Sequence, residues 1–133
     1  MVARAGFPPE ARLRRPSEFR AVFAEGRKFV CDGFVIIAAA RDREGARLGL
    51  ALAKRRIARA VDRNRVKRVL RESFRSARIE LGRVDVVVLA RSRTATMENA
   101  ELFSQLARIW PRIARLSDAP NAAGAGRPPA GQR

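Results

Sequence analysis

Histidine and tyrosine are absent from this chain of 133 residues, and cysteine occurs once, at Cys31. Histidine is the commonest general acid–base residue and the commonest metal ligand, so most hydrolase and metalloenzyme chemistries lack their usual groups here. A single cysteine forms no internal disulfide, and no Cys/His cluster is present to hold zinc. The chain also has no glycine-rich phosphate loop and no G-x-S-x-G motif. It therefore offers few candidates for catalysis by its own side chains.

Long hydrophobic runs are missing as well. No segment approaches the roughly 20 apolar residues that cross a bilayer, and Met1 to Glu10 lacks the apolar stretch of a secretory signal. We therefore expect a cytoplasmic protein without a membrane partner. A chain of 133 residues is long enough for one modest hydrophobic core but too short for two.

Positive charge, by contrast, is present in large excess. The chain has 29 Lys and Arg residues against 13 Asp and Glu residues, a formal net charge of +16 at pH 7. Its hydrophobic fraction of 47% is nevertheless that of an ordinary globular protein. The excess indicates an anionic partner, which could be RNA, DNA or an anionic membrane surface.

Hydrophobic spacing predicts helices and strands that alternate along the chain. The expected elements are a helix over 17–26, strand-like residues over 28–40, a strand over 47–53, a helix over 60–80, a strand over 85–90 and a helix over 97–116. The run after Asp85 is continuously apolar, which is typical of a central strand buried on both faces. This order predicts an α+β sandwich in which helices pack on one sheet.

Short polar residues and glycines predict where these helices begin and end. We expect N-caps at Ser17, at Asp62, and at Thr94 or Thr96, with Gly82 just past the end of the long helix. No large apolar residue follows position 119, so residues 117–133 are expected to be a disordered tail. Residues 1–11 are expected to be a flexible lead-in, and residues 12–116 to form the domain.

The segment 63–75 combines dense positive charge with helical spacing of apolar residues. It holds six basic residues and one acidic residue. At about 100° per residue, one side of this helix would carry Arg63, Lys67, Arg71, Arg75 and Arg78. Another side would carry Val66, Val69, Leu70, Phe74 and Ala77 and could dock on a core. Like charges four residues apart repel each other, so the cationic side predicts a polyanionic partner, most simply a nucleic acid.

The stretch from Leu48 to Arg68 resembles the protein subunit of bacterial ribonuclease P. In that family a strand ending in a Ser-Lys-Lys type sequence leads through a short loop into an Arg-Asn-Arg helix, here Arg63-Asn64-Arg65. The resemblance extends over about residues 10–116. It implies an αβββαβα two-layer sandwich with a left-handed βαβ crossover around this helix, against the usual right-handed rule.

The resemblance also implies a function. In the family, a large catalytic RNA uses Mg²⁺ to hydrolyse a phosphodiester and to release the 5′ leader of precursor tRNA. The protein binds that RNA and the leader, so this chain would be an accessory subunit that is inactive alone. The implied RNA contacts are Lys54, Arg55, Arg56, Arg59, Arg63, Asn64, Arg65, Lys67, Arg68 and Arg71.

Two further sites follow from the same resemblance. Asn64 would help to hold a metal ion, and a leader-binding cleft between the first helix and the sheet would contain Phe19, Phe23, Phe34 and Ile37. Aromatic side chains can stack on bases, although phenylalanine on an amphipathic helix is as often part of the core. The chain departs from the family pattern at three positions: Ala53 replaces Ser, Ala58 replaces Gly, and Ile37 stands where relatives often carry an aromatic residue.

Other functions stay open on the residues alone. A ribosomal or general RNA-binding protein, with ribosomal RNA as partner, would share the charge but not the combined motif. A helix-turn-helix DNA-binding protein fits less well, because the basic helix follows a strand. A self-sufficient nuclease needs clustered carboxylates, whereas Asp62, Glu72 and Asp85 are spaced as helix caps and salt bridges.

Overall fold

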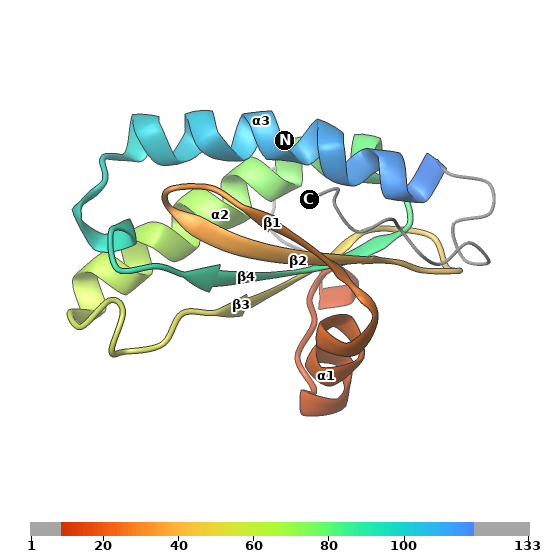
Figure 1. The fold of residues 1–133 in the computed structure, drawn as a ribbon, viewed down its shortest axis with the longest axis horizontal. Coiled ribbons are helices and arrows are strands. Elements are labelled where there is room, and N and C mark those ends of the chain that lie inside the picture. The colour runs from red at the N-terminus through yellow and green to blue at the C-terminus, as the bar shows by residue number, and fades with distance from the viewer. Residues whose placement is uncertain (1–8, 119–133) are drawn as a thin grey trace.

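A computed structural model of the chain describes residues 9–118 and shows a four-stranded sheet with helices on both faces (Figure 1). The elements in chain order are the 3₁₀-helix η2 (Pro9–Ala11), α1 (Pro16–Glu25), β1 (Arg27–Val30), β2 (Phe34–Ala40), β3 (Arg47–Ala51), α2 (Ala60–Leu81), β4 (Val84–Ala90), the 3₁₀-helix η3 (Thr94–Thr96) and α3 (Asn99–Asp118). This order confirms the predicted α+β fold. No helix within residues 9–118 is long and apolar enough to cross a membrane.

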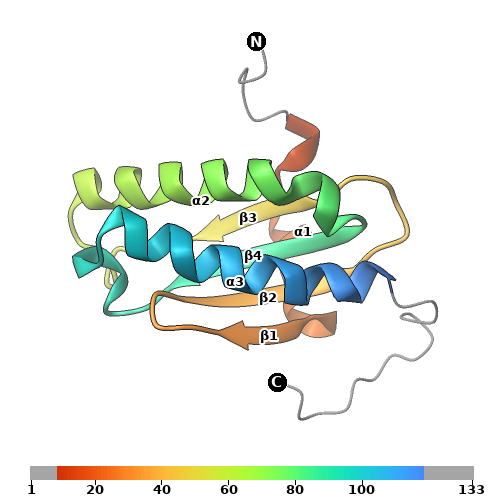
Figure 2. The same ribbon diagram turned by 90° about the horizontal axis from the view of Figure 1, so that it is seen from above.

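The sheet is mixed, with strand order β1-β2-β4-β3. β1 pairs with β2 and β2 with β4 in antiparallel fashion, whereas β3 and β4 are parallel and are connected through α2. Figure 2 views the sheet from the side that carries α2. When this view is turned so that β3 and β4 point upward, β4 lies to the left of β3. The β3–α2–β4 crossover is therefore left-handed, as the resemblance implied and against the common rule.

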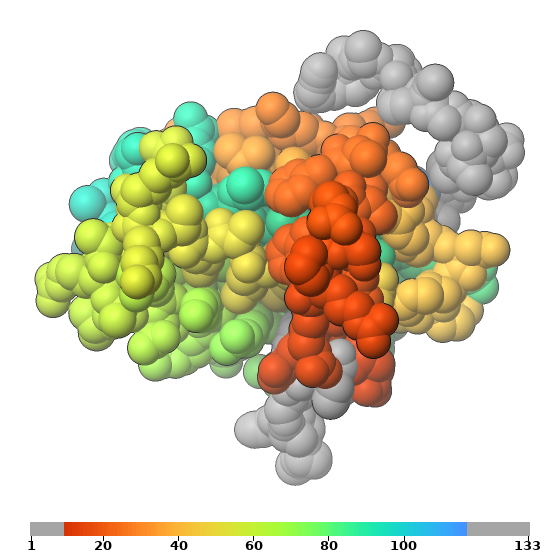
Figure 3. Space-filling model, turned by 90° about the horizontal axis from the view of Figure 1, so that it is seen from below, coloured from red at the N-terminus to blue at the C-terminus, as the bar shows by residue number. Residues whose placement is uncertain are grey.

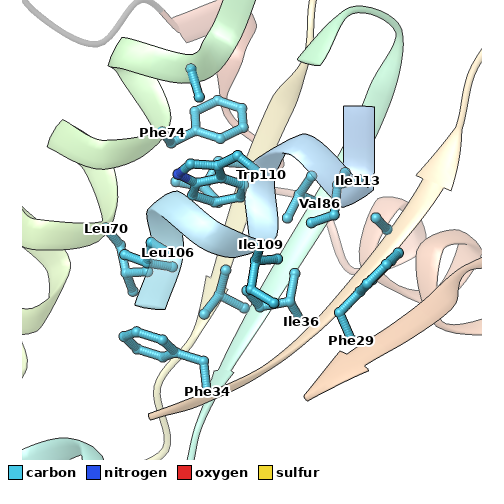
Figure 4. Close-up of a cluster of buried hydrophobic side chains, with 14 of the residues drawn as sticks. Phe29, Phe34, Ile36, Leu70, Phe74, Val86, Leu106, Ile109, Trp110 and Ile113 are labelled. Atoms are coloured by element: carbon cyan, nitrogen blue, oxygen red, sulfur yellow. The ribbon is translucent and has the colours of Figure 1, made fainter. Parts of the chain in front are cut away.

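The main core lies between the sheet and the layer formed by α2 and α3 (Figure 4). The apolar side predicted for α2 is buried, including Phe74, which has no exposed surface. The Phe74 ring meets Trp110 of α3 edge-on, with ring centroids 5.8 Å apart and planes at 71°. The Trp110 indole N–H donates a hydrogen bond of 2.8 Å to Ser73 Oγ, so this large side chain is buried without losing a polar partner.

A smaller core lies on the opposite face of the sheet, beneath α1. Strand alternation sends Ala39 and Val87 to this face, where they meet Leu13 and Val22. The predicted two-layer sandwich thus describes the sheet with α2 and α3, and α1 adds a helix on the second face (Figure 1). Residues 12–13 attach along β3, because Arg12 bridges Leu48 and the Leu13 N–H donates to the Leu48 carbonyl at 3.0 Å.

The predicted start of the first helix is wrong. α1 begins at Pro16, with extended Arg15 as its N-cap, so Ser17 lies inside the first turn. Proline suits the first helical position, because its fixed φ is helical and its missing N–H would have no partner there. The Glu18 carboxylate accepts hydrogen bonds from the backbone N–H groups of Arg14 at 2.9 Å and Arg15 at 3.0 Å. The Glu18 carboxylate thus satisfies backbone donors just before the helix, and no serine hydroxyl caps the first turn.

The other predicted N-caps are wrong too. α2 begins at Ala60 with Arg59 as N-cap, which places Asp62 within the first turn, where its charge favours the positive end of the helix dipole. Thr94 and Thr96 lie in η3, before α3 begins. The buried Thr94 hydroxyl donates to the Gly33 carbonyl at 2.6 Å, so it joins two loops. Gly82 does end α2, with φ of 74°, which confirms that prediction.

The predicted domain limits also need adjustment. Residues 9–11 form η2, and Ala11 is fully buried, so this part of the expected lead-in belongs to the fold. α3 continues to Asp118, two residues into the expected tail. The remainder of both predictions, residues 1–8 and 119–133, lies outside the described residues.

Candidate nucleic-acid interface

The implied RNA contacts gather at the end of the molecule where β3 and β4 finish. The loop over residues 52–59 leaves β3 there and leads into the first turns of α2 (Figure 1). The loop is anchored by Ile57, whose side chain is fully buried. The backbone N–H groups of Arg56 and Ile57 both donate to the Ala53 carbonyl, at 2.9 and 3.1 Å. The loop thus holds a compact turn even with alanine at positions 53 and 58.

Arg63 stabilises this loop from within the helix. Its Nη1 donates hydrogen bonds of 2.8 Å to the Ile57 carbonyl and 2.9 Å to the Ala58 carbonyl. Two backbone acceptors that follow the turn are therefore satisfied by a cation. The side chain is half-buried, so Arg63 orients the loop more than it presents charge to solvent.

The cations of the loop itself are exposed. Lys54, Arg55, Arg56 and Arg59 all point to solvent. Arg56 Nη1 donates to Ser92 Oγ at 3.1 Å, which joins this loop to the one after β4. Arg59 stands 4.0 Å from the Asp62 carboxylate and is 76% exposed, so that contact holds it weakly. Four exposed positive side chains, two of them without such a contact to any described residue, are consequently placed where they can meet phosphate oxygens.

Arg65 uses its guanidinium inside the protein. Nη1 donates to Asn99 Oδ1 at 2.7 Å and to the Met97 carbonyl at 3.1 Å, and Nη2 donates to the Ala95 carbonyl at 3.0 Å. These bonds join α2 to the segment that links η3 and α3. The resemblance implied an RNA contact at this position, and the structure adds a role in holding two helices together.

The predicted stripe on α2 is only partly available: Arg75 is exposed but pairs with Glu72 at 3.7 Å, and Arg78 is half-buried. Asn64, Arg68 and Arg71 are exposed, and Lys67 is half-buried. At the far end Arg78 Nε donates to the Ala46 carbonyl at 2.9 Å, so it fixes the turn before β3 instead. We call the following set the basic end: the exposed cations Lys54, Arg55, Arg56, Arg59, Arg68 and Arg71, the half-buried Lys67, and Asn64 among them.

Arg12 is a cation near this surface that the sequence reasoning missed. Burial lowers the pKa of the Arg71 guanidinium, and the positive charge of Arg12 lowers it further. The two arginines are therefore close enough to repel, although one lies before α1 and the other on α2. Their proximity follows from the bridge between Arg12 and Leu48 on β3, which no local sequence pattern predicts.

A second surface lies on the α1 face of the sheet. Figure 3 shows α1 on one side and the loop over 52–59 on the other, with the sheet left uncovered between them. Phe19, Ile37, Ala51 and Leu89 are partly buried on this face, and Phe23 is 44% exposed. We call this region the α1 groove. Ala51 and Leu89 were missed from the sequence, because their place depends on strand register.

Phe34 does not line the α1 groove. Its side chain has no exposed surface and belongs to the main core beneath α2 and α3 (Figure 4). Successive residues of a strand point to opposite faces, so Phe34 and Ile37, three positions apart on β2, cannot share a face. The implied cleft position of Phe34 is wrong.

The described residues provide no metal site of their own. Within residues 9–118 no group of three Asp, Glu, Cys or His side chains is placed to hold an ion. Asn64 would supply one amide oxygen, which does not suffice for Mg²⁺. Asp85 lies in salt bridges, and Glu72 pairs with Arg75 at 3.7 Å, as their spacing predicted. The described carboxylates therefore do not fit two-metal hydrolysis.

Comparison with known proteins agrees with this geometry. The family model described as Ribonuclease P matches residues 7–114. The ribonuclease P protein component of Thioalkalivibrio sulfidiphilus is 42% identical over 113 residues, covering 85% of this chain and 94% of that protein. That of Methylococcus capsulatus is 41% identical over 105 residues, covering 79% and 82%.

Solved structures show the same fold. The RNase P protein from Thermotoga maritima superposes with a TM-score of 0.68 at 26% identity, covering 77% of this chain and 96% of that one. The Staphylococcus aureus RNase P protein gives a TM-score of 0.70 at 24% identity, covering 74% and 91%. The basic end and the α1 groove of this chain are therefore built on the fold that these proteins share.

Proposed function

This chain belongs to the ribonuclease P protein family, and we propose that it binds the catalytic RNA of ribonuclease P together with the 5′ leader of precursor tRNA. Membership makes it the protein component of a ribonucleoprotein endoribonuclease that acts in the maturation of tRNA 5′ ends. The comparisons give no support to ribosomal RNA as the partner.

The basic end is the observation that carries the RNA-binding proposal. Seven cations from one loop and one helix lie together, and the loop geometry is fixed by Arg63 and Ile57. Arginine binds phosphate oxygens through a planar fork of donors, and a fixed row of such side chains can follow a phosphate backbone. The surrounding arginines repel one another until an anion neutralises them, which favours bound RNA.

The α1 groove supports the leader-binding proposal. It combines a partly buried Phe19 and an exposed Phe23 with an aliphatic floor that includes Ile37 and Leu89. Aromatic rings bind single-stranded bases by stacking with little sequence preference. The groove opens beside the loop over 52–59 (Figure 3), so a strand lying in it would have cations next to its phosphates.

In this proposal the RNA carries out the hydrolysis. The protein positions the RNA backbone and the leader, and its arginines neutralise phosphate charge near the scissile bond. Mg²⁺, when bound, supplies an activated water and stabilises the phosphate oxygens. The RNA would supply most ligands for that ion, with Asn64 adding at most one amide oxygen.

Reconstitution tests this function directly. Purified protein should leave precursor tRNA intact, and addition of bacterial ribonuclease P RNA should give cleavage at the mature 5′ end. RNA alone at the same Mg²⁺ concentration is the control, and the protein should raise the rate above it. Cleavage by the protein alone, or no effect of the protein on the RNA, would reject the proposal.

A further inference from the structure

Asp85 is a buried carboxylate that gathers arginines from two neighbouring elements. It lies opposite Arg47 in the parallel ladder of β3 and β4, and its side chain is 2% exposed. Arg47 holds it with two parallel hydrogen bonds, from Nε to Oδ1 at 2.9 Å and from Nη2 to Oδ2 at 2.8 Å. Arg41 Nε adds a third bond of 3.1 Å to Oδ2, and Arg43 stands 3.9 Å away. The buried charge is thus fully compensated.

The same two arginines extend to α1. Arg47 Nη1 donates to Glu18 Oε2 at 3.1 Å, and Arg41 Nη1 donates to Glu25 Oε1 at 2.6 Å. Glu18 lies in the first turn of α1 and Glu25 is its last residue, so the two contacts are about 10 Å apart along the helix axis. Both ends of α1 are therefore connected through one arginine each to the carboxylate of Asp85.

The apolar attachment of α1 is slight by comparison. Within α1, all of whose residues the structure describes, only Val22 is buried. Phe19 lies on the sheet above Gly49, where an added Cβ would stand 2.7 Å from its Cζ atom. A helix with so small an apolar contact can shift over a sheet unless directional bonds prevent it.

We propose that Asp85, Arg47, Arg41, Glu18 and Glu25 form a clamp that sets the position of α1 over the sheet and hence the width of the α1 groove. These are positioning residues, because they act on the leader through α1 and its phenylalanines. The inference rests on the proposed leader binding and adds which residues control it. The Glu25–Arg41 arm, with Glu25 60% exposed, is the weaker one and opens first.

The Glu25→Gln variant tests the clamp with little risk to folding. It removes the charge from one end of α1 and leaves the Asp85–Arg47 pair intact. The readout is the ratio of holoenzyme affinities for precursor tRNA with a leader and for the same tRNA without one. The clamp predicts that this ratio falls about threefold, with a higher KM for the precursor and an unchanged kcat at saturation.

Glu44→Gln is the matched control. Glu44 is 84% exposed, pairs with Arg83 at 2.8 Å in the turn after β2, and causes the same change of net charge. We call the ratio of affinities with and without a leader the leader effect. Both substitutions make the protein more positive, which by itself strengthens RNA binding. A weaker leader effect in Glu25→Gln therefore cannot come from net charge. Glu44→Gln should leave the ratio unchanged.

The possible outcomes distinguish a failure of the clamp proposal from a failure of the proposed function. An unchanged ratio in Glu25→Gln, or an equal fall in Glu44→Gln, overturns the clamp. Wild-type protein that shows no leader effect, or that fails to bind the catalytic RNA, instead refutes the proposed function. Asp85→Asn should reduce the ratio further than Glu25→Gln; should this variant fail to fold, the comparison of Glu25→Gln with Glu44→Gln still decides.

Discussion

Arg65 on α2 donates a hydrogen bond of 2.7 Å to Oδ1 of Asn99 at the start of α3. The same guanidinium donates to two backbone carbonyls of the preceding segment, so it connects α2 to η3 and to the start of α3. The last residue of the Arg63-Asn64-Arg65 motif therefore supports the fold beside the basic end.

Substitution of Arg65 should lower both stability and function. We expect Arg65→Ala to reduce the free energy of unfolding by about 2 kcal/mol, because partly buried carbonyls lose a charged donor. Thermal melting checks this value, with Arg65→Lys as the comparison that keeps the charge but loses the fork. Unchanged melting together with weak RNA binding would mean that Arg65 acts mainly as an RNA contact.

Arg68 provides the opposite case on the same helix. Its side chain is exposed and within residues 9–118 makes no hydrogen bond or ion pair. We expect Arg68→Ala to leave melting nearly unchanged and to reduce the salt dependence of RNA binding by roughly 0.7–0.9 in log–log slope. Titration of the catalytic RNA at several salt concentrations measures this slope.

Arg83→Ala is the control for that measurement. Arg83 is exposed in the connection between α2 and β4, at the end of the sheet away from the basic end, and it pairs with Glu44. The substitution removes the same charge, so its slope should stay closer to that of the wild type. Equal slopes for both variants would show that net charge, and not the basic end, determines RNA binding.

Gly49 beneath Phe19 links strand packing to the α1 groove. A Cβ at this position would stand 2.7 Å from Phe19 Cζ and 3.0 Å from Leu13 Cβ. We expect Gly49→Ala to destabilise the protein by about 1–3 kcal/mol and to push the Phe19 ring away from the sheet. Leader-dependent affinity should fall with it, as measured with precursor and mature tRNA.

Gly33→Ala is the control for packing strain alone. Its added Cβ would approach Leu102 Cδ2 at 3.1 Å and Met97 Sδ at 3.2 Å, on the side of the sheet that α3 covers. It should lower the melting temperature and leave the leader effect intact. A loss of the leader effect in both variants would assign it to general destabilisation.

Glu18 should make stability depend on pH in the acidic range. Hydrogen bonds from the N–H groups of Arg14 and Arg15 lower the pKa of its carboxyl, and the charge of Arg47 lowers it further. A carboxyl with a lowered folded-state pKa contributes stability above its unfolded value of about 4.3, and this contribution is lost as the pH falls through the folded value. Melting temperatures of the wild type and Glu18→Gln should therefore differ at neutral pH and converge below about pH 4. A constant difference across that range would contradict the lowered pKa.

The amino-acid pattern predicts most elements because their signals are local. Alternating or continuous apolar residues indicate the strands, and the apolar side of α2 is buried as its spacing indicated. The helix caps were predicted less well. α1 begins at Pro16, and the Glu18 carboxylate accepts a backbone hydrogen bond there, whereas a serine hydroxyl was expected as the cap. The handedness of the crossover followed from the resemblance, because no property of the residues themselves opposes the right-handed rule.

The charge, the order of elements and the family can be predicted from the amino-acid pattern, because they depend on residues close together in the chain. Which cations face solvent depends instead on how distant segments pack. Arg65 and Arg68 stand three positions apart on α2, yet the first bonds α3 and the side chain of the second makes no hydrogen bond or ion pair within residues 9–118. The packing of distant segments likewise places Phe34 in the main core and connects Asp85 to α1 through Arg41 and Arg47. The physical reason is that these contacts depend on strand register and on which face of the sheet a helix covers, and both are set by pairing between distant segments.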